Sequence, residues 1–277
     1  MREICKTLGV ARSNVLDRLN KEAMPRAKRY SKKDDPFFLV LIKEIMRERT
    51  TYGYRRVTAK LNAKLKGLEK AVVNHKRVYR IMREGGLLQK RGIPKFDRLH
   101  QGRIITLKSN LRWCSDCFEL KCWSGERLRV AFALDCCDRE IIGYVSSRKP
   151  IKASDIQELL IDSVEKRFGG SLTLPHPIEW LSDNGMCYVA NETVRVVRSL
   201  GFKVCTTPSR SPESNGMAES FVKTFKRDYA YVNDLTDALV VEAKLAQWFE
   251  DYNEEAPHKG LKMMSPRQFR RAQFANG

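Results

Sequence analysis

Three acidic residues have the types and the spacing for metal-dependent chemistry on phosphodiesters. Asp116 lies within an apolar stretch, where a charge is costly unless it is paired or binds a metal ion. Asp183 follows a short apolar run and opens Asp-Asn-Gly, which is also good turn chemistry. Glu219 falls in a predicted helix, where an ion pair with Lys223 is the structural alternative. Taken singly, each residue has a structural explanation.

The combination of the three is more specific than any one of them. Thirty-five residues separate Asp183 from Glu219, and Asp116 lies on the strand that leads the predicted sheet. Three carboxylates around two divalent ions suit phosphoryl transfer, because the metals activate a water or a 3′-hydroxyl and stabilise the leaving oxygen. All-oxygen ligands favour Mg²⁺, and we expect two such ions here, with Mn²⁺ able to replace them.

The elements that must position these residues follow from hydrophobic periodicity. Strands are predicted at 111–120, 128–136, 140–147, 178–182 and 202–206, and helices at about 153–168, 191–200, 215–230 and 237–252. The second and third strands should form a hairpin with the first beside them. This order predicts an α/β fold in which a mixed five-stranded sheet is flanked by helices.

The first part of the chain is predicted to be helical throughout. Residues 2–20 indicate two short helices broken at Gly9, and further helices are expected at 36–49, after Gly53, and at 72–84. We therefore divide the chain into a helix-turn-helix-like fragment (1–24), a charged linker (25–35), a basic helical DNA-binding domain (36–92), a second linker (93–109) and a catalytic domain (110–277).

The formal charge of the protein, +19, is confined to its first part. Residues 1–108 hold 29 Lys and Arg against 10 Asp and Glu, whereas residues 109–277 hold 23 of each. Such asymmetry predicts a polyanion as partner of the basic half. A basic helix face after a turn is typical of a recognition helix in the major groove, although a solvated surface helix has the same pattern. The candidate DNA contacts in this half are Arg55, Arg56, Lys76, Arg77 and Arg80.

Composition argues against several other classes of protein. No run approaches the roughly 18–20 apolar residues that a membrane span needs, and the N-terminus lacks the plan of a secretory signal. The eight cysteines alternate with apolar residues in predicted strands, which favours small buried side chains over a zinc site. We expect a cytoplasmic, nucleoid-associated bacterial protein with no membrane partner.

Several stretches in the right order resemble a known family. They include TYGYRRVTAKLN, KRVYRIMREGGLL, NLRWCSDCFEL, EWLSDNGMCYVANET and SRSPESNGMAESFVKTFKRDY, and the likeness runs from about residue 36 to 272. The sequence is similar to the OrfB-type transposases of the insertion-sequence-three family, nearest its insertion-sequence-two branch. These enzymes carry a retroviral-integrase-like DDE catalytic core.

The resemblance implies an RNase H-like fold and places the DDE roles on Asp116, Asp183 and Glu219. It implies that Lys226, two helical turns beyond the glutamate, reaches a phosphate. Lys223, Asn184 and Asn215 gain weight as further DNA contacts. It also implies a homo-oligomer on double-stranded DNA, a copy-out route, and a fusion with the product of an upstream reading frame.

Two other interpretations remain open at this stage. The protein could be a DNA-binding regulator with structural carboxylates, or an RNase H-like nuclease that hydrolyses DNA without joining it. Joining and hydrolysis use the same metals and differ only in the nucleophile. Asp135, Asp138 and Glu213 are the alternative acidic candidates. His258 is either a general acid–base group or, as we favour, a structural hydrogen-bonding residue.

Overall fold

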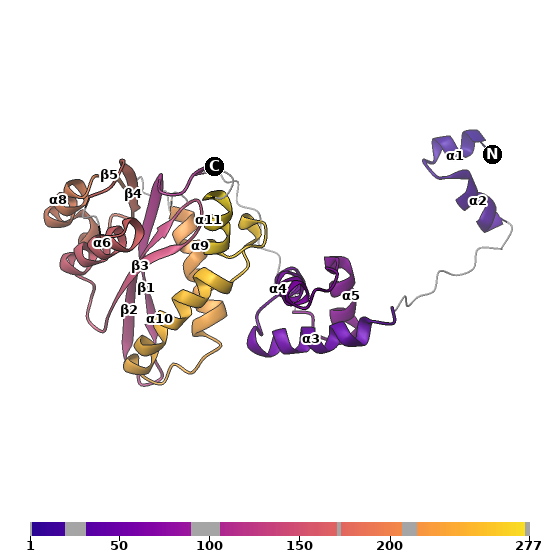
Figure 1. The fold of residues 1–277 in the computed structure, drawn as a ribbon, viewed down its shortest axis with the longest axis horizontal. Coiled ribbons are helices and arrows are strands. Elements are labelled where there is room, and N and C mark those ends of the chain that lie inside the picture. The colour runs from indigo at the N-terminus through magenta and orange to yellow at the C-terminus, as the bar shows by residue number, and fades with distance from the viewer. Residues whose placement is uncertain (1, 20–31, 90–105, 171–172, 207–214, 275–277) are drawn as a thin grey trace.

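The computed structural model describes residues 2–19, 32–89, 106–170, 173–206 and 215–274. Its elements fall into three parts along the chain: a short N-terminal helix pair, a unit of three helices, and a sheet covered by helices (Figure 1). In these described residues no helix is long and apolar enough to cross a membrane.

The N-terminal pair consists of α1 (Arg2–Thr7) and α2 (Arg12–Leu19). Gly9 separates them with a φ of +60°, a left-handed conformation that glycine adopts without strain. The pair buries Cys5 but leaves Ile4, Leu8 and Leu19 more than half exposed. The predicted break at Gly9 is confirmed, and the pair is too small to enclose a core of its own.

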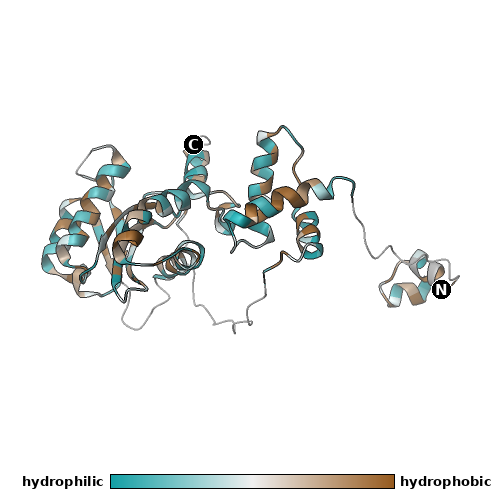
Figure 2. Ribbon diagram, turned by 90° about the horizontal axis from the view of Figure 1, so that it is seen from below, coloured by the Kyte–Doolittle hydropathy of each residue, from teal (hydrophilic) through white to brown (hydrophobic). Residues whose placement is uncertain are grey.

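The helical unit contains α3 (Asp35–Glu48), α4 (Tyr54–Gly67) and α5 (His75–Glu84). Hydrophobic and hydrophilic residues alternate along these helices (Figure 2), as expected of amphipathic helices that share one core. Ile42, Leu61 and Val78, one from each helix, are fully buried in that core. The first helix begins at Asp35, one residue earlier than predicted. The third begins at His75, three residues later than predicted, because the side chain of Asn74 accepts the Lys76 N–H at 2.9 Å and caps the helix there.

The second unit is a five-stranded sheet in the order β3-β2-β1-β4-β5. The strands are β1 (Arg112–Lys121), β2 (Arg127–Asp135), β3 (Ile141–Ser147), β4 (Ile178–Ser182) and β5 (Phe202–Thr206). The first three are antiparallel, and β4 and β5 run parallel to β1. The predicted mixed five-stranded sheet, with its hairpin and the first strand beside it, is confirmed.

Helices cover both faces of the sheet (Figure 1). One face packs on α9 (Gly216–Phe225), its continuation η2 (Lys226–Ala230) and α10 (Ala238–Glu255). The other packs on α6 (Ala153–Phe168), the short α7 (Met186–Val189) and α8 (Asn191–Ser199). A 3-10 turn, η3 (Lys259–Leu261), and α11 (Pro266–Phe274) follow α10. The predicted single helix over 215–230 is wrong in one detail, because its last turn is a π-helix.

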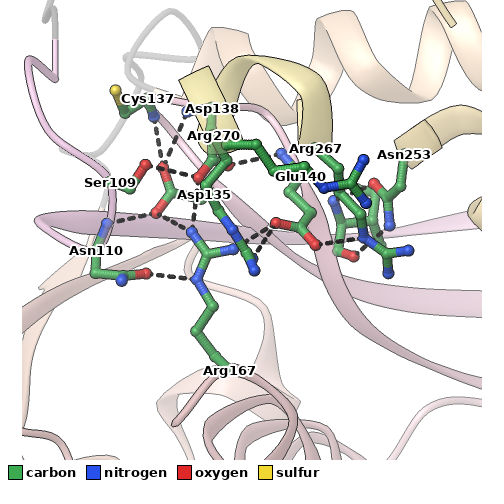
Figure 3. A network of polar contacts seen from close by, with 12 residues as sticks. Ser109, Asn110, Asp135, Cys137, Asp138, Glu140, Arg167, Asn253, Arg267 and Arg270 are labelled. Carbon is green, nitrogen blue, oxygen red and sulfur yellow. Dashed lines mark hydrogen bonds and ion pairs between the residues drawn. The ribbon is translucent and has the colours of Figure 1, made fainter. Parts of the chain in front are cut away.

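A buried ionic network fixes the turn between β2 and β3 (Figure 3). Asp135 and Asp138 are fully buried and Glu140 nearly so, and all three carboxylates contact the guanidinium of Arg167 from α6. Asp135 also accepts the N–H of Asn110 at 2.6 Å, and two arginines of α11 bind Glu140. The network ties the segment before β1 and the C-terminal helix to the same corner of the sheet.

Candidate catalytic carboxylate site

Asp116 occupies a core-facing position in the middle of β1. It pairs with Phe132 on β2. It lies on the same face of β1 as Cys114 and Phe118, which point into the core under α9 and α10. Its carboxylate accepts the N–H of Cys117 at 2.7 Å. Among the residues that the structure describes, no lysine or arginine forms an ion pair with it, so the charge that the sequence placed in an apolar strand is not neutralised by a structural cation.

Asp183 follows β4 directly and lies beside Asp116. The parallel register pairs Cys114 with Leu181, so two further residues along each strand bring Asp183 level with Asp116 on the same face. Asp183 Oδ1 accepts the N–H of Gly185 at 3.0 Å. A Cβ atom at Gly185 would stand 3.0 Å from that oxygen, which explains a glycine at this turn.

Glu219 comes from the helix that covers this face of the sheet. Phe221 of α9 is buried against the sheet, and Glu219 lies near the N-terminal end of the same helix, with its side chain 43% exposed. It pairs with Lys223 at 3.2 Å, the ion pair expected from the i,i+4 spacing. Lys226 is held with its ammonium 5.7 Å from the centroid of the Phe118 ring, two residues along β1 from Asp116.

The charges of these groups act on the Asp116 carboxyl group. Burial raises the pKa of Asp116 to about 6, the Cys117 N–H lowers it in part, and the charges of Asp183 and Glu219 raise it further. Lys226 acts in the opposite direction on the same carboxyl group. Three carboxylates therefore repel one another here, and one cationic side chain only partly offsets them.

This arrangement suits a divalent cation in its chemistry, but the side chains are not yet gathered around one point. The donors are all carboxylate oxygens, and a bound cation would relieve the repulsion that raises the pKa of Asp116. Over the described ranges, no three His, Cys, Asp or Glu side chains lie close enough together to hold a metal ion. Asp183 and Glu219 are instead engaged with Gly185 and Lys223.

One residue that the sequence did not single out ties the three elements together. The hydroxyl of Ser115, the neighbour of Asp116, lies 2.7 Å from the hydroxyl of Tyr188, which belongs to the short helix after Asp183. The main-chain carbonyl of Ser115 accepts the side-chain amide of Asn215 at 3.0 Å, at the start of α9. All three partners are buried. Ser115 thus connects the strand of Asp116 to the segments that carry Asp183 and Glu219.

Asn215 accordingly has a different position from the one that we predicted. We expected it to contact DNA, but it is only 7% exposed and its amide is used by Ser115. Asn184 and Lys223 lie at the exposed rim of the carboxylate site. The loop 207–214, with the alternative acid Glu213, lies outside the described residues.

The predicted DNA contacts of the helical unit divide into two groups. Arg55 and Lys76 are exposed. Arg77 and Arg80 were expected to be exposed, and this was wrong, because both bind the carboxylate of Asp35, at 2.8 and 2.7 Å. That carboxylate belongs to the first turn of α3, so the two arginines fasten α5 to α3. Arg56 is also withdrawn from the surface, as described below.

Asp135, Asp138 and His258 have structural surroundings. Asp135 and Asp138 belong to the buried network around Arg167 (Figure 3). His258 is packed edge-on against Tyr252, and burial lowers its pKa to about 3. An imidazole with that pKa stays neutral at physiological pH, but its Nε2 is buried without a hydrogen-bond partner among the described residues, so the hydrogen bonding that we favoured stays a prediction.

The fold and the matching domain families define an enzyme with an RNase H-like integrase core. Models described as integrase core domain match residues 107–212 and 200–266, and one described as HTH-like domain matches residues 32–93. Among solved structures, a simian T-cell lymphotropic virus intasome in complex with the PP2A regulatory subunit B56 gamma aligns with a TM-score of 0.49 at 17% identity, over 77% of this chain and 74% of that one. The catalytic core domain of BIV integrase aligns with a TM-score of 0.42 at 18% identity, over 60% and 97%.

Curated relatives narrow the class to one family. Transposase InsD of insertion element IS2A/D/F/H/I/K from Escherichia coli is 48% identical over 248 residues, which cover 88% of this chain and 81% of the relative. Transposase InsD of insertion element IS2D from Escherichia coli strain K12 matches to the same extent. The chain belongs to this family of insertion-element transposases.

Proposed function

We propose that this transposase cleaves DNA at the ends of its element and joins the freed 3′-hydroxyl to another phosphodiester, using Asp116, Asp183 and Glu219 as ligands of divalent cations. The observation that supports the proposal is that Asp183 and Glu219 lie near enough to Asp116 for their charges to act on it, adding to the burial that raises its pKa to about 6. Mg²⁺, with Mn²⁺ as a substitute, would polarise the phosphodiester and activate the attacking oxygen.

The chain's own residues would orient the substrate. Lys226, on the Glu219 side of the helix, can contact a phosphate beside the carboxylates. Gly185 has no side chain, so the DNA backbone can approach Asp183 closely. The exposed side chains of Arg55 and Lys76 supply positive charge on the helical unit for double-stranded DNA. Because two element ends must be joined, we propose that at least two copies act together, with an upstream-frame fusion as the source of further contacts.

A strand-transfer assay tests the proposal. A labelled duplex from the terminus of the element is incubated with Mg²⁺ and wild-type protein, Asp183→Asn, or the matched control Asp234→Asn, in which an exposed aspartate remote from the site is changed. Joined product with the wild type and the control, lost in Asp183→Asn, supports the proposal. Hydrolysis without joining in the wild type would favour the nuclease alternative. DNA binding with no product from any protein would contradict catalysis by the chain alone.

A further inference from the structure

The helical unit and the integrase core are held together by ion pairs that all lie at one region of the core. On the helical side are Arg49, Thr51, Arg56 and Lys60; on the core side are Asp228 in η2 and Asp251 and Glu255 in α10. We call these residues the interdomain clamp. Arg49 pairs with Asp251 and Lys60 with Glu255, while Arg56 and Thr51 both bind Asp228 at 2.6 Å.

Asp228 is the centre of this clamp. Its side chain is only 4% exposed and accepts hydrogen bonds from Arg56, from Thr51 and, at 2.7 Å, from Arg227 beside it. Burial alone would raise the pKa of Asp228, but these donors outweigh burial and lower it to about 2. An exposed ion pair contributes little, whereas loss of one partner from a buried, multiply bonded carboxylate leaves a charge without compensation.

Both terminal nitrogens of Arg56 are engaged in contacts. One terminal nitrogen binds Asp228, the other donates to the carbonyl of Thr51 at 3.2 Å, and the guanidinium lies 4.0 Å from the ring centroid of the buried Tyr52. Its neighbour Arg55 is exposed and interacts only with Tyr54 among the described residues. Two adjacent arginines of one motif therefore differ in environment, and only Arg55 is presented to solvent.

The core side of the clamp lies on the helix that carries Glu219. Seven residues of helix are about two turns, so Lys226 lies on the Glu219 side, whereas nine residues are about two and a half turns, so Asp228 lies on roughly the opposite side. One continuous helix thus faces the carboxylate site with one side and the helical unit with the other. Its last turn is a π-helix, a feature frequent at functional sites.

We propose that Arg56 and Asp228 are positioning residues that lock the DNA-binding helical unit to the back of the catalytic helix, so that DNA held by the one is delivered in fixed register to the other. This inference rests on the proposed function, and it replaces our prediction that Arg56 contacts DNA. In this view the clamp sets the rate of joining, while Arg55 and the other exposed cations set the affinity for DNA.

Adjacent arginines allow a matched test on the full chain. Arg56→Gln and Asp228→Asn are compared with Arg55→Gln in three measurements: the maximal rate of joining, the affinity for a short duplex of random sequence at several salt concentrations, and hydrogen exchange of residues 226–230. For Arg56→Gln and Asp228→Asn we expect joining to slow about tenfold, since small misplacements at a reaction centre are costly, with affinity nearly unchanged. The two effects should not add in the double variant.

The other results are equally specific. Exchange in residues 226–230 should accelerate about tenfold in the two clamp variants but not in Arg55→Gln, which should instead lose affinity and about one from the salt slope. If Arg56→Gln weakens DNA binding as Arg55→Gln does, and Asp228→Asn changes neither exchange nor rate, the clamp is refuted. Exchange needs no activity, so it still decides the question if the wild type proves unable to join DNA, and faster exchange throughout the chain rather than in residues 226–230 would contradict a local role of the clamp.

Discussion

Replacing Asp116 by Asn should stabilise the protein while it abolishes activity. In the fold the pKa of Asp116 rises from 3.8 to about 6, so above pH 6 the native state carries a charge that the unfolded chain accommodates at less cost. The shift corresponds to about 3 kcal/mol as an upper limit, and solvent at the half-buried side chain reduces this to about 1–2 kcal/mol. Asparagine keeps the shape and can still accept the Cys117 N–H.

Thermal unfolding at pH 7.5 in a chelator measures this effect. We expect the midpoint of Asp116→Asn to lie about 2–8 °C above the wild type, at about 2–4 °C per kcal/mol for a domain of this size. Because an acid with a raised pKa loses stability as pH rises from its unfolded to its folded value, the difference should shrink between pH 6 and pH 4. Mg²⁺ should stabilise the wild type and not the variant. An unchanged midpoint in the chelator, or a difference that does not shrink on acidification, would refute the reasoning.

Three further variants test separate parts of the structure. Tyr188→Phe removes the hydroxyl that binds Ser115 and should slow joining about tenfold at a cost of about 1 kcal/mol in the free energy of unfolding; an unchanged rate would show that this bond does not position the site. Lys226→Gln should lower the slope of log affinity against log salt by about one, and an unaltered slope would exclude a phosphate contact. Arg167→Met leaves three buried carboxylates without their shared cation and should cost about 3–5 kcal/mol in urea unfolding; a loss below about 1 kcal/mol would contradict that role.

The sequence predicted the elements around the site closely, for a physical reason. Strand β1 alternates Trp113, Ser115 and Cys117 on one face with Cys114 and Phe118 on the other, and both faces are covered by helices. Such periodicity is a local property of the chain, so the bounds of all five strands were predicted to within one residue. Asp116 was identifiable because it interrupts an apolar pattern.

Pairings between distant segments could not be predicted in the same way. Arg56 and Arg77 lie in basic segments that are typical of a DNA-contacting surface. The carboxylate partner of Arg56, Asp228, is far away in sequence, and that of Arg77, Asp35, belongs to the predicted linker. Ser115 carries no chemical signal of its own, and its role depends on Tyr188 and Asn215 meeting it from opposite directions. Periodicity shows whether a side chain faces inward or outward, but it does not identify the charged residue with which that side chain pairs.

The linkage of all three carboxylate segments through Ser115 affects how copies of such an element are judged intact. A copy that keeps the three acids but replaces Ser115 or Tyr188 would pass a motif inspection and still carry a misaligned site. Its helical unit would remain whole, so we expect it to occupy element ends and to process them more slowly than an intact copy. Mutated copies of this kind would then compete with active ones for the element ends. The accumulation of such mutations would lower the rate of transposition of the element.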